Sequence, residues 1–133
     1  MTTLFSAAAT VDRTQDIARV SNGRVVLWVG QFVIAAAFLM AGGSKFAGAP
    51  AMVQMFDAIG IGQWFRYVTA TIEVGSAIAL LVPSLAPYGA AALVATMTGA
   101  VATHLFIVGG SPLPALVLGA GSAAIAWFRR DQF

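Results

Sequence analysis

The chain has 133 residues, of which 59% are hydrophobic and only 9% are charged, and its mean hydropathy is +0.88. Soluble domains carry about 25% charged residues, so this composition excludes an ordinary soluble domain and indicates one compact membrane unit. The net charge is +2, but the seven Lys and Arg residues are scattered, which argues against nucleic acid as a partner. Because cysteine is absent, thiol redox chemistry is excluded, and any electron transfer requires a bound cofactor or a partner protein.

The first 23 residues mix acidic and basic side chains, and we expect a cytoplasmic tail that is either a solvated arm or a surface helix. An apolar segment, residues 25–46, follows this tail. It is too long for the apolar region of a signal peptide, so we expect a retained first span. The chain then divides into a tail, residues 1–23, and a membrane domain, residues 24–133.

Four apolar windows have the roughly 17–25 residues that a bilayer-spanning helix needs. They are residues 25–46, 66–82, 87–108 and 112–128. Pro83 and Pro87 bracket one turn, and the run from Gly109 to Pro112 breaks the chain before the last window. The pattern predicts an all-α membrane protein, a four-transmembrane-helix bundle whose helices run alternately up and down.

The segment between the first two spans, APAMVQMFDAIGIGQWF, places apolar side chains at roughly helical spacing. This spacing predicts a short amphipathic helix at the outer interface of the membrane. An ordinary loop, capped by aromatic residues that favour the interface, is the alternative.

Basic residues near the ends of the spans predict the orientation of the chain. An even number of spans puts five of them on one side: Arg13, Arg19, Arg24, Arg129 and Arg130. Only Lys45 and Arg66 fall on the other side. We therefore expect a multi-pass protein of the inner (plasma) membrane with both termini in the cytoplasm.

Three ionisable residues from three different spans are expected to converge near the outer face. Lys45 ends the first span, Glu73 lies about 10 Å along the second, and His104 lies about 6 Å from the end of the third, at 1.5 Å per residue. Each lies on the same helix face as a row of small residues, and such rows are where transmembrane helices approach one another. Gln31 lies on the same side of the first span as Lys45 and can bond across helices.

Placing the charged side chain of Glu73 inside the bilayer costs about 2.5–3.5 kcal/mol of insertion free energy, and this cost favours a functional role. Buried in this way, it either takes up a proton or is held charged by a cation. We expect a polar pocket in which Glu73 and His104 are the catalytic, proton-exchanging pair. The ligand-binding residues are predicted to be Lys45, Glu73, His104, Trp64 and Met97. Interhelical hydrogen bonding and snorkelling of Lys45 to water are the structural alternatives. One carboxylate and one imidazole fall short of a metal site.

The stretches FLMAGGSKF, TIEVGSAIALLV and ATMTGAVATHLF resemble the DoxX-like family of small integral membrane proteins. The resemblance covers residues 28–127, and Lys45, Glu73 and His104 match the family's polar pattern. It implies a membrane subunit or accessory protein of a redox system, since some relatives are subunits of thiosulfate:quinone oxidoreductases.

On this resemblance, the expected ligand is a quinone, with no intrinsic cofactor. The expected partners are the bilayer, a redox protein or larger membrane complex, and further copies of the chain. A small proton-coupled transporter and a purely structural subunit are the alternatives, and catalysis by this chain alone is not expected.

Overall fold

The computed structural model describes residues 2–133, and all regular structure among them is helical. The all-α prediction is therefore confirmed. The chain divides into two units, one ending at Gly30 and the other running from Gln31 to Phe133, and each is described by itself.

The first unit is the N-terminal part of helix α1, which runs from Thr2 to Ala47. The predicted tail and the first predicted span thus belong to one helix. The sequence pattern had predicted that the spanning helix starts near Val25. No proline precedes Pro50, and an isolated glycine such as Gly23 costs a helix only about 1 kcal/mol. Local propensity therefore allows the helix to continue through the polar segment.

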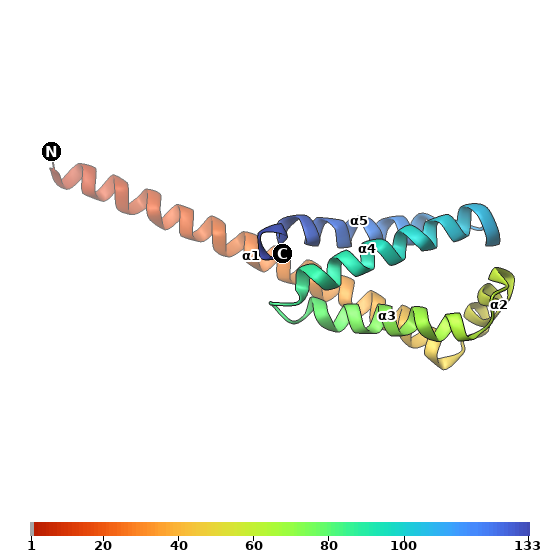
Figure 1. The fold of residues 1–133 in the computed structure, drawn as a ribbon. Helices are drawn as coiled ribbons and strands as arrows, with labels where there is room; N and C mark the ends of the chain where they lie inside the picture. Colours follow the sequence, from red (N-terminus) through yellow and green to blue (C-terminus); the bar gives the residue numbers. More distant parts are fainter. Residues whose placement is uncertain (1) are drawn as a thin grey trace. The chain divides into compact units, whose positions relative to one another are not determined.

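The second unit contains the rest of α1 and every later helix (Figure 1). These are α2 (Pro50–Ile59), α3 (Trp64–Leu80), α4 (Ala86–Thr103), the π-helical turn η1 (His104–Val108), α5 (Leu113–Phe128) and the 3₁₀ turn η2 (Arg130–Gln132). Helices α3, α4 with η1, and α5 correspond to the last three predicted windows, within about two residues at each end. The segment before α3 is a helix, so the loop alternative was wrong.

Helix α1 ends where glycine and proline prevent its continuation. Gly48 has a φ of +70°, and its own amide and the following one close the helix: Gly48 N–H donates to Lys45 O (3.3 Å) and Ala49 N–H to Ser44 O (3.0 Å). This is the Schellman arrangement, and Pro50 then begins α2 without needing an amide donor. The chain is thereby folded back next to the end of α1.

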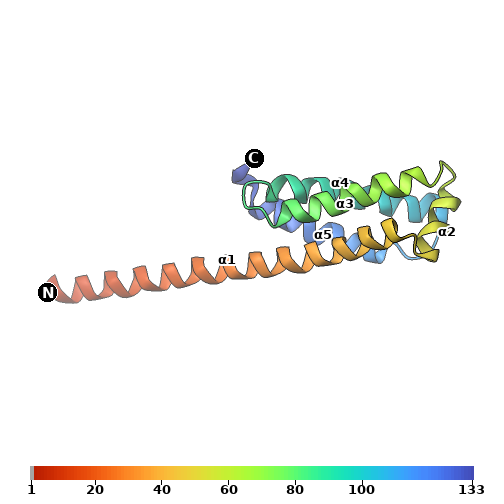
Figure 2. The same cartoon turned by 90° about the horizontal axis from the view of Figure 1, so that it is seen from below.

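Close approaches at glycine fix the packing of the long helices in the second unit. A Cβ on Gly42 of α1 would lie 2.6 Å from Val74 of α3, and one on Gly89 of α4 would lie 2.7 Å from the carbonyl oxygen of Ser76 in α3. A Cβ on Gly121 of α5 would similarly lie 2.7 Å from Ile34 of α1. Small residues therefore let these helices approach closely. Figures 1 and 2 show α3, α4 and α5 side by side.

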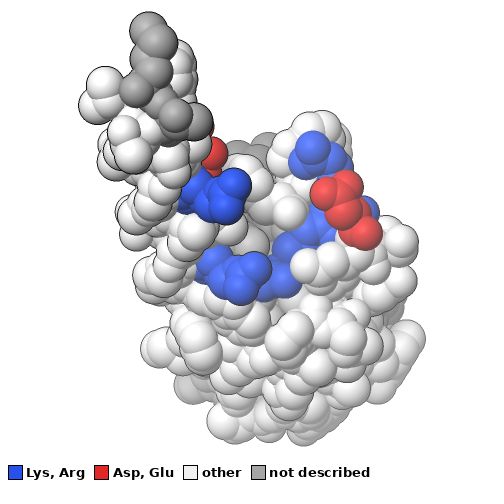
Figure 3. All heavy atoms as spheres, turned by 90° about the vertical axis from the view of Figure 1, so that its left-hand side faces the viewer, with Lys and Arg blue, Asp and Glu red and all other residues white. Residues whose placement is uncertain are grey.

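Within residues 2–133, two helical segments are long and apolar enough to cross a bilayer, Thr3–Ala47 and Ala86–Val108. Helix α5 is apolar but shorter, and α3 carries Arg66 and Glu73. Much of the surface is apolar: Phe106 is 84% exposed and Ile78 is 54% exposed. The larger part of the face shown in Figure 3 is likewise uncharged. These features are typical of a membrane protein rather than a soluble one.

Candidate functional site

An ion pair joins α1 to α3. Lys45 Nζ donates to Glu73 Oε2 at 3.0 Å, and the Glu73 side chain is only 2% exposed, against 12% for Lys45. Gly42 lies one turn before Lys45 on the face that contacts α3, where a Cβ would be 3.5 Å from that of Glu73. The close helix approach therefore brings the two charges together. From the sequence, Lys45, His104 and, at the interface, Arg66 were the possible partners for Glu73, and the structure pairs it with Lys45.

Arg66, which is 6% exposed, ties the same end of α1 to α3. Its Nη1 donates to the carbonyl of Lys45, in the last turn of α1, while its Nε donates to Gln63 Oε1 (2.8 Å). A cation at a helix C-terminus is favourable because the last carbonyls lack intrahelical partners. The sequence placed Arg66 at the interface as an orienting charge. The structure gives it a positioning role beside the ion pair.

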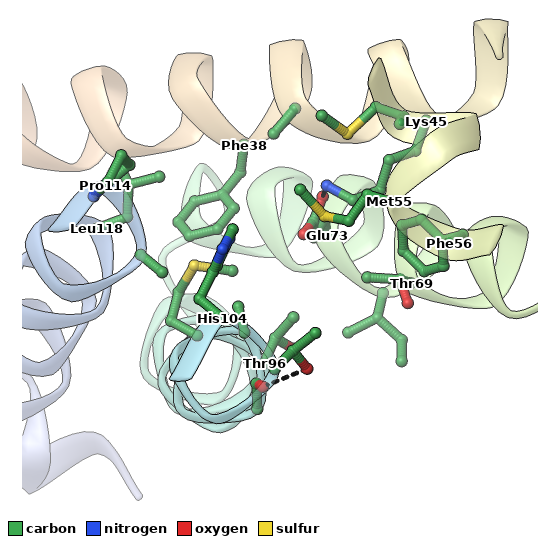
Figure 4. Close-up of a pocket in the computed structure, with 18 of the residues that line it drawn as sticks. Phe38, Lys45, Met55, Phe56, Thr69, Glu73, Thr96, His104, Pro114 and Leu118 are labelled. Atoms are coloured by element: carbon green, nitrogen blue, oxygen red, sulfur yellow. Dashed lines mark hydrogen bonds and ion pairs between the residues drawn. The ribbon is translucent and has the colours of Figure 1, made fainter. Parts of the chain in front are cut away.

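The ion pair opens on a cavity of about 380 Å³ within the second unit. Residues of α1, α2, α3, α4 and α5 line it, and most of them are apolar, including Phe38, Met55, Phe56, Met97 and Leu118. Figure 4 shows Phe38, Glu73 and His104 around this space. A volume of this size and an apolar wall with few polar groups are typical of small-molecule pockets.

The threonines that line the cavity have their hydroxyls turned to their own helices. Thr69, Thr96 and Thr103 each donate to the carbonyl four residues earlier, at 2.9, 2.8 and 2.8 Å. Their donor protons are thus already used. The ion pair and the imidazole of His104 therefore dominate the polar chemistry of the cavity.

His104 lines the cavity at the start of the π-helical turn η1. Its Nδ1 lies 2.9 Å from the carbonyl oxygen of Gly109, five residues later in the chain. No direct bond between His104 and Glu73 is found among residues 2–133. The structure thus brings the predicted pair to one cavity without joining the two side chains.

The other two predicted ligand-binding residues differ in their placement. Met97 is 7% exposed and lines the cavity. Trp64 lies outside the lining: it is 60% exposed, and its Nε1 donates to the carbonyl of Ile61 at 2.8 Å. The turn that starts α3 directs the indole away from the cavity, and its neighbour Phe65 lines the wall instead.

Helix α2 forms one wall of the cavity with its apolar face, through Met52, Met55, Phe56 and Ile59. The sequence pattern predicted an interfacial helix here but gave no sign that its apolar face lines the site. Gln63 attaches it to α3, because its Nε2 donates to Val53 O (3.0 Å) and Asp57 Oδ1 (2.6 Å) while its Oε1 accepts from Arg66.

A second buried polar cluster lies at the opposite end of α3. Gln31 is fully buried; its Nε2 donates to Leu80 O (2.6 Å) and its Oε1 accepts from Arg129 Nε (2.6 Å). The prediction that Gln31 bonds across helices is confirmed. Arg129, whose position in the sequence predicts a cytoplasmic orienting charge, is only 7% exposed. The sequence signal for this cluster was a basic residue, Arg129, directly after the last apolar window, together with Gln31 as the one glutamine of the first window.

Among residues 2–133, no three His, Cys, Asp or Glu side chains are close enough to hold a metal ion. What the cavity offers is an ammonium donor, a carboxylate and an imidazole on an apolar wall. That arrangement can bind a lipophilic molecule that carries a small polar head and can exchange protons with it.

The fold and the cavity define a small helical membrane protein with a polar centre inside an apolar pocket. The sequence profile of the DoxX-like family matches residues 29–129, so the chain belongs to the DoxX-like family. The resemblance noted from the sequence is thereby confirmed. No curated protein sequence matches the chain, and no solved structure matches it.

Proposed function

We propose that this protein is a membrane subunit or accessory protein of a quinone-linked redox system, and that its cavity binds the head of a quinone-type molecule. The observation that carries the proposal is the Lys45–Glu73 pair, buried in a cavity whose wall is otherwise mostly apolar. A purely packing role is served better by apolar side chains, because desolvating two charges is expensive.

The ion pair suits a ligand whose head carries an acceptor oxygen, either the carbonyl of a quinone or the hydroxyl of a quinol. An ammonium has three donor protons, and Glu73 takes one of those of Lys45, so others remain for a ligand oxygen. Phe38, Met55 and Met97 supply the apolar contacts that an aromatic ring needs. The chain has no cysteine for thiol redox chemistry of its own, and the proposed route for electrons to or from the bound quinone is a partner protein.

The proposed setting is a four-pass arrangement with both termini in the cytoplasm of a bacterial inner membrane. The contacts of Gln31 with Leu80 and of Lys45 with Glu73 make α1 and α3 antiparallel, and α4 and α5 are joined by a short turn. Under this orientation, the cavity lies in the outer half of the membrane and the Gln31–Arg129 cluster in the inner half. Arg66 and the last turn of α1 then lie near the outer interface.

Co-purified lipids test the proposal. The protein is purified in mild detergent from quinone-containing membranes, and bound quinone is quantified by extraction and mass spectrometry. We expect quinone in the wild type and a loss of about tenfold in Lys45→Met, since a hydrogen bond to a charged group contributes about 1.5 kcal/mol or more. Thr98→Val, at an exposed residue of α4 that does not line this cavity, is the matched control. Equal quinone in wild type and Lys45→Met would contradict the proposal.

A further inference from the structure

The hydrogen bond within η1 determines which nitrogen of His104 is available to a ligand. The carbonyl oxygen of Gly109 can only accept, so the His104 nitrogen 2.9 Å from it, Nδ1, must carry the proton. In the neutral imidazole, the other nitrogen, Nε2, is then an acceptor with a free lone pair.

Nε2 is directed into open space rather than into protein. No hydrogen-bond partner for it occurs in the described part of the chain, residues 2–133. In the same residues, no buried side-chain nitrogen or oxygen lacks a partner, so Nε2 is accessible. His104 lines the cavity, and Figure 4 shows its imidazole pointing into the space beside Phe38.

We propose that His104 makes the cavity selective for a hydroxyl-bearing aromatic head, the quinol form of the ligand, whose hydroxyl donates to Nε2. A quinone carbonyl has no proton to give, and its oxygen repels a lone pair at the same position. This inference rests on the proposed function, because it assigns the form of the ligand bound at that site.

The backbone of η1 and Gly109 positions the imidazole of His104. Residues His104–Val108 form a π-helical turn, and Gly109 follows with a φ of +73°, a conformation that side-chain-bearing residues rarely adopt. This turn brings the carbonyl of Gly109 back to Nδ1 of the residue that starts η1. The tautomer is therefore set by the chain itself, before any ligand binds.

A ligand pair in which a methyl group replaces the donor proton tests the inference. 4-Octyloxyphenol and its O-methyl ether have the same ring and tail, and their dissociation constants are measured by titration calorimetry in one detergent. For the wild type and Thr98→Val, we expect the phenol to bind about five- to tenfold more tightly, the effect of one hydrogen bond. His104→Phe should still bind the ether and show no preference.

Since His104 is the sole histidine of the sequence, ¹⁵N-histidine labelling gives a second readout without any substitution. We expect a protonated Nδ1 and an unprotonated Nε2, and a shift of the Nε2 resonance with the phenol only. A protonated Nε2, or equal binding of phenol and ether to the wild type, overturns the inference and leaves the proposed function standing. Binding of neither compound overturns both.

Discussion

Lys45 and Glu73 differ in burial, so the loss of the ion-pair partner should cost a different amount of stability for each of them. Glu73 is 2% exposed and lies in the middle of α3, whereas Lys45 is 12% exposed and lies at the end of α1. A lysine that loses its partner can extend its flexible stem to water, but a carboxylate at the position of Glu73 cannot. The two single substitutions should therefore have different consequences.

We expect Lys45→Met to lower the free energy of unfolding by roughly 3 kcal/mol, because it leaves a buried carboxylate without its cation. Glu73→Leu should cost less, and the double variant should recover most of the loss, since it removes both charges. Unfolding in a detergent–denaturant titration, followed by circular dichroism, measures all three. A double variant as unstable as the sum of the singles would refute this description of the pair.

At the scale of the elements, glycines decide how closely α3 and α4 pack. A Cβ on Gly89 would meet three atoms of α3 at 3.1 Å or less: Ser76 O, Ala79 Cβ and Leu80 N. Two of these are backbone atoms that cannot rotate away. On the same helix, a Cβ on Gly99 would meet nothing within 4 Å.

Gly89→Ala should therefore destabilise the protein by about 1–3 kcal/mol, as expected when extra volume is forced into a packed interface. Gly99→Ala is the matched control, and it should be neutral or up to about 1 kcal/mol stabilising, because alanine favours the helix. The same denaturant titration distinguishes them. Equal stability of the two variants would mean that α3 and α4 are not in this close contact.

Helix α2 depends on Gln63 for its attachment to α3. In Gln63→Ala, the bonds to Val53 O and Asp57 and the bond from Arg66 are lost together. We expect amide hydrogen exchange in α2 to rise by about tenfold or more, while exchange in α4 is unchanged. Gln54→Ala, an exposed residue on α2, is the control. Unchanged exchange in α2 would show that apolar contacts alone hold this wall of the cavity.

Apolar windows and proline positions predicted the helices well, because membrane composition leaves few alternatives. They could not show that α1 extends back to Thr2, since local helix propensity there is independent of the membrane. The convergence of Lys45 and Glu73 followed from residue spacing, but the direction of Trp64 depended on the turn before α3. The partners of Arg66 and Arg129 depend on tertiary packing, which hydropathy does not report.

For the whole molecule, the proposed four-pass arrangement has a direct test, because the natural chain contains no cysteine. Single cysteines replace Thr14 and Ser84 on the expected cytoplasmic side, and Gln54 and Ser111 on the expected outer side. A membrane-impermeant maleimide added to whole cells of the expression host should label only the latter two, and all four after permeabilisation. Labelling of Ser84→Cys in intact cells would contradict the arrangement.

The central claim is that the cavity beside Lys45 and Glu73 binds a quinone head. Photo-crosslinking with an azido-quinone, followed by peptide mass spectrometry, locates the bound head without relying on activity. We expect labels on cavity residues such as Met55, Met97 and Leu118. Excess unlabelled quinone, added before illumination, should prevent this labelling. Labels confined to exposed residues outside the cavity, such as Phe106 and Ile78, and not reduced by excess quinone, would contradict the claim.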